Sequence, residues 1–431
     1  MAAFDPSSAH AHALDTSDPL AAFRAQFFQP ANGAIYLDGN SLGLLSRPAE
    51  AAVIRALEDW KTRAIGGWLG AGWFDLAERL AGRLAPLVGA EADEVAVANS
   101  TTVNLHQLLA TLYRPDGLQN KILAFAGEFP SDLYAIRSHL ALRHHDARSV
   151  DELLTLLPAG DANDWIDEAA VERAFDDPRL QLAVLPAVVY TTGQLLDARR
   201  LATAAQRAGV ILGFDLSHSI GIVPHSLTAD GVDFAFWCHY KYLNAGPGAV
   251  GGLFLHRRHF DRAPGLAGWW GSHKERQFDM VREQTPARGA GALQIGTPPV
   301  LGMAALEGAL AIIAEAGIAA IREKSLALTS YLMECVETLL PDDAGFRFAN
   351  PREARRRGGH VALRHPAAGQ FCRALRAADV ITDFRPPDIL RLAPVPLYNT
   401  FSECHAAVAR LREIWEHSAH LRLAAERELV P

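Results

Sequence analysis

Residues 210–218 read V-I-L-G-F-D-L-S-H, an apolar run that ends in the acid Asp215, with His218 three residues later. A continuous apolar run of this length is typical of a strand buried on both faces of a parallel sheet. Similar short runs occur at residues 94–98, 121–124, 182–185, 234–236 and 252–255, and helical periodicity occurs at 49–64, 103–112 and 197–208. This alternation predicts an α/β fold with a mostly parallel central sheet and helices on both faces.

The pattern changes after Pro298-Pro299, where a long helical stretch runs from residue 300 to about residue 340. Charged helical stretches and short strands then fill residues 345–431, which predicts a smaller α+β domain at the C-terminus. We therefore expect an N-terminal arm at residues 1–45, a large domain at 46–300 and a small C-terminal domain at 301–431.

The composition is that of a globular protein, with 49% hydrophobic and 21% charged residues. The 41 Lys and Arg against 49 Asp and Glu give a net charge of −8, which argues against nucleic-acid binding. No uncharged apolar stretch is long enough to span a membrane, and no secretory signal is visible. The four cysteines are scattered without a C-x-x-C pair, so we expect no metal site and a cytoplasmic location.

A short apolar run at residues 95–98 is followed by Asn99-Ser100-Thr101-Thr102 and then by helical periodicity. Hydroxyl groups at the start of a helix can simply cap it. The same position also offers free backbone N–H groups and the positive end of the helix dipole to an anion. A phosphate site is therefore the alternative interpretation.

Asp215 and Lys241 are the other two candidate functional residues. A buried acid at the end of a strand needs a partner, which can be a backbone cap or a cationic ring nitrogen. Most lysines lie on the surface, but apolar and aromatic neighbours such as those of Lys241 are typical of a Schiff-base lysine. The G-x-G-x-x-G sequence at residues 246–251 precedes an expected strand, so it does not indicate a dinucleotide site.

Together these three features match the needs of pyridoxal 5′-phosphate, which requires an anion site, a carboxylate for its ring nitrogen and an amine for its aldehyde. Their order along an α/β chain predicts an enzyme that uses this cofactor.

The chain also resembles the kynureninases, which are pyridoxal-phosphate hydrolases of fold type I, the aspartate-aminotransferase fold. The resemblance covers all but about the first and last thirty residues. It rests on Y-L-D-G-N-S-L-G at 36–43, T-V-N-L-H at 102–106, F-P-S-D at 129–132, F-D-L-S-H at 214–218, Y-K-Y-L-N-A-G at 240–246, G-W-W-G at 268–271 and L-R-L-A-P-V-P-L-Y-N-T-F at 390–401.

The resemblance implies a role for each matching residue. Lys241 would bind the cofactor aldehyde and shuttle the substrate α-proton, Asp215 would pair with the ring nitrogen, and Tyr240 would be an acid/base group. Residues implied to contact the cofactor are Thr101, Thr102, Phe129, Pro130, Ser131, Asp132, Asp215, His218, Tyr240, Lys241, Trp269 (or Trp270) and Thr297. Residues implied to contact the substrate are Arg391, which suits the α-carboxylate, with Trp68, Asn40 and Ser41.

The implied reaction is the hydrolysis of L-kynurenine to anthranilate and L-alanine by cleavage of the Cβ–Cγ bond. It belongs to tryptophan catabolism and the kynurenine route to NAD. The implied assembly is a homodimer in which Trp269 and Thr297 reach the phosphate of the partner subunit. Trp68 and Gly296-Thr297 match the bacterial pattern, which favours kynurenine over 3-hydroxykynurenine. The rival functions on the same fold are an aminotransferase and a cysteine desulfurase.

Two departures from the family pattern are visible. Pro186 replaces a hydroxyl residue that often touches the cofactor, so we expect one contact fewer. Ser272 interrupts the block that starts at Gly268, which leaves the alignment of His273 open.

Overall fold

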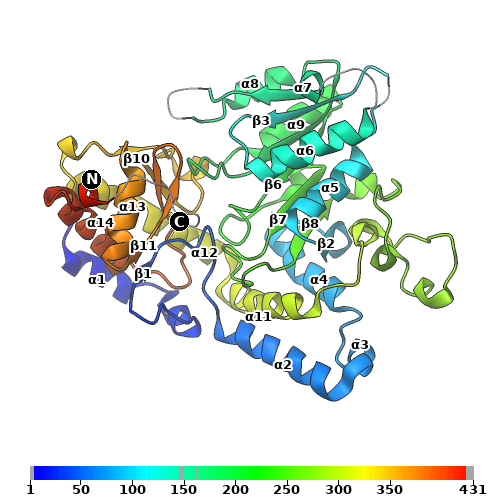
Figure 1. Ribbon diagram of the computed structural model, residues 1–431, viewed down its shortest axis with the longest axis horizontal. Coiled ribbons are helices and arrows are strands. Elements are labelled where there is room, and N and C mark those ends of the chain that lie inside the picture. Colours follow the sequence, from blue (N-terminus) through cyan, green and yellow to red (C-terminus); the bar gives the residue numbers. More distant parts are fainter. Residues whose placement is uncertain (1–3, 116, 145–149, 161–163, 424–431) are drawn as a thin grey trace.

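The computed structural model describes residues 4–115, 117–144, 150–160 and 164–423 (Figure 1). Its main feature is a seven-stranded sheet with the strand order β2-β8-β7-β6-β5-β3-β4. Only β8 runs antiparallel to its neighbours, so the predicted mostly parallel sheet is confirmed. The strands are β2 (Val95–Ala98), β3 (Lys121–Phe125), β4 (Leu154–Leu157), β5 (Leu180–Pro186), β6 (Ile211–Asp215), β7 (Phe234–Cys238) and β8 (Gly251–Leu255).

The inner strands are mostly apolar because both faces of the sheet are buried there. In β6, Leu212 and Phe214 join one core, whereas their neighbour Ile211 packs against a second core on the opposite face. The first core also contains residues of α4 (Leu76–Val88), α9 (Ala198–Ala208) and α11 (Val300–Ala316), and the second contains residues of α5 (Thr101–Leu112) and α6 (Pro130–Arg143). Shorter helices and a long surface helix complete this part of the chain, namely α2 (Arg47–Arg63), α3 (Gly67–Gly70), α7 (Val150–Leu153), α8 (Glu168–Ala174) and α10 (Leu227–Asp230).

A second, smaller layer lies beside the main sheet (Figure 1). It holds an antiparallel four-stranded sheet with the order β12-β13-β10-β9. Its strands are β9 (Arg347–Phe348), β10 (Val361–Arg364), β12 (Asp383–Arg385) and β13 (Ile389–Leu392), and its helices are α12 (Ile318–Leu339), α13 (Ala368–Ala377) and α14 (Phe401–Glu416).

The N-terminal segment belongs to this second layer. Helix α1 (Ser8–Thr16) packs against α14, and β1 (Ile35–Tyr36) pairs in parallel with β11 (Val380–Ile381). Ala11, Ile35 and Leu37 share one core with residues of α12, α13 and α14.

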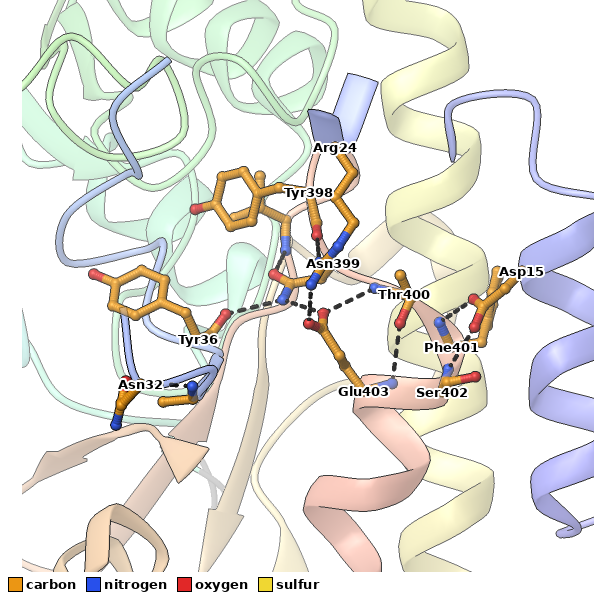
Figure 2. Close-up of polar contacts among 12 residues, drawn as sticks. Asp15, Arg24, Asn32, Tyr36, Tyr398, Asn399, Thr400, Phe401, Ser402 and Glu403 are labelled. Atoms are coloured by element: carbon orange, nitrogen blue, oxygen red, sulfur yellow. Dashed lines mark hydrogen bonds and ion pairs between the residues drawn. The ribbon is translucent and has the colours of Figure 1, made fainter. Parts of the chain in front are cut away.

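Polar contacts fix this segment to the start of α14 (Figure 2). The Asp15 carboxylate accepts the backbone N–H groups of Phe401 at 2.6 Å and Ser402 at 3.1 Å. Arg24 donates to a carboxylate oxygen of Glu403 at 2.7 Å and to the carbonyl oxygen of Tyr398. The N-terminal segment therefore adds to the cap of the last long helix, whose own capping box is formed by Thr400 and Glu403.

The predicted helical stretch from residue 300 to about residue 340 is two helices, because the chain bends by 81° between α11 and α12 at Gly317. Gly317 has a φ of 76°, which favours glycine. Helix α11 packs against α2 and α4, which belong with the main sheet. This packing favours a division between the two layers at Gly317, later than the end of the predicted large domain at residue 300.

Among the described residues, no single helix is long and apolar enough to cross a membrane, although the bent pair α11 and α12 would pass on length and composition together.

Candidate active site

Lys241 lies in the turn after β7, at the end of the sheet where β6 also finishes. Its Nζ is 2.9 Å from Nε2 of His218 and 5.8 Å from the centre of the Phe129 ring. Burial, together with the positive charge of Lys241, holds the pKa of His218 well below its usual value. A hydrogen bond between Lys241 Nζ and His218 Nε2 orients the lysine.

Asp215 is the last residue of β6, and its carboxylate accepts the backbone N–H of Ser217 at 2.8 Å. Burial raises the pKa of Asp215, whereas the positive charge of Lys241 lowers it. Pro186 on β5 is paired with Asp215 in the sheet and offers no hydroxyl group to the site. A buried carboxylate beside a lysine is suited to stabilise a cation, as the sequence predicts.

The two helix N-termini nearest to these residues lack side-chain caps. Neither Ser100, before α5, nor Phe129, before α6, makes a side-chain hydrogen bond to the free N–H groups of its helix. Instead, Thr102 Oγ1 and Ser131 Oγ are 2.7 Å apart and join the two helix starts. The capping interpretation is thus not what the structure shows at Ser100, and the free N–H groups at the start of α5 remain available to an anion.

Segment 38–43 reaches the same region from the N-terminal side. The backbone N–H of Gly43 donates to the carbonyl oxygen of Tyr240 at 2.8 Å. Asn40 is fully buried, and neither its amide nitrogen nor its amide oxygen has a partner; the Ser41 hydroxyl is also without one. Burial raises the pKa of Tyr240, so its hydroxyl stays protonated at neutral pH.

Arg391 lies on β13 of the smaller sheet and is 1% exposed. Its Nη1 donates to the carbonyl oxygen of Tyr190 at 2.7 Å, and its Nη2 forms an ion pair with Asp383. The Tyr190 ring packs edge to face on Phe129, with 5.5 Å between ring centres. Arg391 is thus linked through Tyr190 to Phe129, whose ring lies near Lys241 Nζ.

Trp68, Trp269 and Thr297 form a separate group. Trp68, on α3, packs against Trp270, with 5.3 Å between ring centres, whereas Trp269 is 40% exposed and Thr297 is exposed. In the described part of the chain, no hydrogen bond or ring contact joins these three residues to Lys241.

Several residues at the site were missed by the sequence analysis, and Glu128 is the clearest of them. Oxygen atoms of Glu128, Asp132 and Asp215 all lie within 4.8 Å of one another, so a cation between them would be stabilised. One oxygen each of Glu128 and Asp132 is buried without a partner. Burial raises the pKa of both groups, and the neighbouring carboxylates raise it further. The only signal in the sequence was the position of Glu128 directly before the F-P-S-D block.

His360 is a second missed residue. It is fully buried, its two ring nitrogens lack side-chain hydrogen-bond partners, and its ring centre is 6.2 Å from that of His218. No pattern in the sequence around it indicated a functional role.

Comparisons with known proteins identify the family. Residues 321–411 match the model of the kynureninase C-terminal domain. A kynureninase of Geobacillus thermodenitrificans is 47% identical to this chain over 99% of both sequences, and one of Shouchella clausii is 47% identical over 98% of this chain and 97% of its own. The chain belongs to the kynureninase family.

Solved structures of more distant proteins share the fold. A cysteine desulfurase of Thermococcus onnurineus superposes with a TM-score of 0.74 at 19% identity, covering 90% of this chain and 96% of its own. A cysteine desulfurase of Escherichia coli gives a TM-score of 0.76 at 19% identity, covering 92% and 98%. At this identity they show the fold alone, which is the predicted fold type I.

Proposed function

We propose that this member of the kynureninase family hydrolyses L-kynurenine to anthranilate and L-alanine with pyridoxal 5′-phosphate as its cofactor. The observation that carries the proposal is the position of Lys241 beside His218 and Phe129, next to the buried Asp215, in a chain related to kynureninases over its full length.

The chain's own residues fit the cofactor. Uncapped N–H groups at the start of α5, with the hydroxyls of Thr101, Thr102 and Ser131, suit a phosphate. The unpartnered buried oxygens of Glu128 and Asp132, beside Asp215, suit a group that carries positive charge. Phe129 is 41% exposed and offers its ring face to a flat ligand.

Pyridoxal phosphate supplies an electron sink for the bonds at the substrate α-carbon. Asp215 holds the proton on the ring nitrogen, because a buried carboxylate stabilises an adjacent cation. Lys241 takes the proton from Cα of the substrate and returns it, and His218 orients Lys241 through the hydrogen bond to Nζ. Arg391 binds the α-carboxylate.

Hydrolysis breaks the Cβ–Cγ bond of kynurenine, and water provides the oxygen that completes the carboxylate of anthranilate. The alanine fragment gains the proton at Cβ. Tyr240, whose pKa burial raises, keeps a proton at its hydroxyl oxygen and can donate it in these transfers.

The dimer with a shared active site is part of this proposal. Trp269 is exposed although it is a large aromatic residue, and it lies away from Lys241 of its own chain. Beside it on α2, α3 and α11 lies an apolar hollow of about 490 Å³, lined by residues that include Trp60, Ile65, Trp68 and Leu301. A second copy that covered this face would bury them. We also propose that Trp68 and Thr297 favour kynurenine over 3-hydroxykynurenine.

Neither rival function has a supporting observation. A cysteine desulfurase needs an accessible thiol, and Cys238, Cys335, Cys372 and Cys404 are all buried. An aminotransferase would need a keto acid as second substrate. The cytoplasmic location and the role in tryptophan catabolism stay predictions from the sequence and the family.

The test uses the purified protein with added pyridoxal phosphate and L-kynurenine. We expect a visible absorbance band, and anthranilate and alanine released in equal amounts without a keto acid. Lys241→Ala should lack both the band and the activity. Release that depends on a keto acid would favour an aminotransferase, and no release would overturn the proposal.

The shared site is tested by mixing two inactive variants, Lys241→Ala and Trp269→Ala. If Trp269 serves the partner's site, mixed dimers regain one intact site and part of the activity. If activity is not regained after subunit exchange, each site is built from one chain.

A further inference from the structure

The smaller sheet contains a buried group of two arginines around one carboxylate. Asp383 on β12 lies directly opposite Arg391 on β13 in the antiparallel register, and the two residues are 0% and 1% exposed. Asp383 Oδ2 is paired with Nη2 of Arg391 and lies 3.2 Å from Nε of Arg385, whose side chain is 25% exposed. Sequence analysis indicated Arg391 alone.

The contacts of Arg391 fix its guanidinium group but do not saturate it. Nη1 donates to the carbonyl oxygen of Tyr190 and Nη2 donates to Asp383, whereas Nε is buried without a partner. A guanidinium group has five N–H donors, so three remain. A substrate carboxylate can therefore bind to Arg391 without breaking its bond to Asp383.

The charges in this group do not cancel within it. One Asp383 carboxylate faces the two guanidinium groups, and its Oδ1 has no hydrogen-bond partner. Asp38, on the segment before Asn40, is the other carboxyl near both arginines. It is 9% exposed, and burial raises its pKa, whereas the charges of Arg391 and Arg385 lower it.

We propose that Asp383 is a positioning residue that holds Arg391 in place for the substrate carboxylate, and that Arg385 shares Asp383 and so fixes it between the two guanidinium groups. The inference rests on the proposed function, in which Arg391 binds that carboxylate. It accounts for a buried ion pair that stability alone does not explain, because such pairs often add little to stability.

A competing explanation predicts the opposite change in carboxylate binding when Asp383 is removed. If Asp383 competed with the substrate for Arg391, its removal would strengthen carboxylate binding. If Asp383 positions Arg391, its removal lets repulsion from Arg385 push the Arg391 guanidinium group out of place, and carboxylate binding weakens although the net positive charge rises.

The experiment compares Asp383→Asn and Arg385→Gln with the control Asp388→Asn. Asp388 pairs with Arg364 at 3.3 Å in the same sheet, at the end of the β10–β13 ladder away from Arg391. Each holoenzyme is titrated by calorimetry with L-alanine, which has the carboxylate, and with the amine formed by decarboxylation of kynurenine, which lacks it. KM and kcat for L-kynurenine are measured in parallel.

We expect both variants to raise the Kd for L-alanine and the KM for L-kynurenine about tenfold, the effect of losing roughly 1.4 kcal/mol. The Kd for the amine should stay unchanged, and the control should behave as the wild type. A merely structural defect would weaken both ligands alike. The double variant Asp383→Asn/Arg385→Gln keeps the net charge of the group, so it decides the question if Asp383→Asn does not fold, and it should also raise the Kd for L-alanine.

Tighter or unchanged L-alanine binding in Asp383→Asn, or in the double variant if Asp383→Asn does not fold, or equal loss of both ligands, would overturn the inference. A wild-type holoenzyme that binds L-alanine but releases no anthranilate would overturn the proposed function instead, and the alanine affinities of the variants would still decide the role of Asp383.

Discussion

Replacing Glu128 by Gln should stabilise the protein without its cofactor at pH 8. Glu128 is 4% exposed, and one of its oxygens accepts only the backbone N–H of Phe129, at 3.2 Å, while the other has no partner. Oxygen atoms of Asp132 and Asp215 lie within 4.8 Å. Burial, and then these neighbouring carboxylates, raise the pKa of Glu128 well above 4.5.

The size of the expected stabilisation follows from the distance between the carboxylate oxygens. Two charges 4.8 Å apart interact by about 3 kcal/mol at an effective dielectric constant of 20. Above pH 4.5 the unfolded chain releases the Glu128 proton. The folded protein either retains this proton or is destabilised by the repulsion between the carboxylates, so its stability falls as the pH rises. Glutamine has no such proton. The variant should therefore match the wild type at pH 4 and exceed its free energy of unfolding by up to about 3 kcal/mol at pH 8.

Urea unfolding of the cofactor-free protein at several pH values measures this difference. The contrast variant is Glu94→Gln, at another buried glutamate. Burial alone would raise the pKa of Glu94, but hydrogen bonds from Arg257 and Thr228 lower it to about 2. Glu94 therefore stabilises the protein above pH 4.5 and loses this effect as the pH falls through 2, so Glu94→Gln should be less stable than the wild type at pH 8. A Glu128→Gln protein that is also less stable at pH 8 would refute the reasoning.

Three further predictions concern folding, each measured by urea unfolding. Asp15→Ala removes the carboxylate that accepts the backbone N–H groups of Phe401 and Ser402 at the start of α14 and should lower the free energy of unfolding by about 1 kcal/mol. Lys324→Met breaks a buried ion pair, with 2.6 Å between Nζ and Asp18 Oδ2, and should cost about 3–5 kcal/mol; Asp18→Asn in the same chain should recover part of this loss. Gly213→Ala places a Cβ 2.1 Å from the Phe234 ring and should cost about 1–3 kcal/mol, so an unchanged midpoint would contradict the packing described for β6.

The central sheet could be predicted from the sequence because its strands are buried on both faces, which makes them apolar without alternation. Strand β4 was not predicted from the sequence because it is not buried on both faces. It lies at the edge of the sheet, and only Leu154 of its four residues is buried. The break between α11 and α12 was missed because a single glycine, Gly317, in an apolar helical stretch does not by itself distinguish a bend from a tolerated residue.

Within the candidate site, residues at the ends of strands were easier to predict than their partners. Asp215 and Lys241 follow apolar runs, and their side chains suit a recognisable cofactor. Asp383 and Glu128 could not be predicted, because their importance comes from a cross-strand register and from the meeting of carboxyls that lie far apart in the sequence. Such pairings exist only in the folded chain.

The attachment of the N-terminal segment to α14 has a consequence for synthesis on the ribosome. All seven strands of the main sheet have been made once Leu255 is translated. Ala11, Ile35 and Leu37, however, pack in a core that also needs Ile414. At about 5–20 residues per second these side chains wait roughly 20–75 s for their partners. During that interval the first apolar residues to leave the ribosome are the last to be buried, which makes them natural targets for chaperones that bind nascent chains.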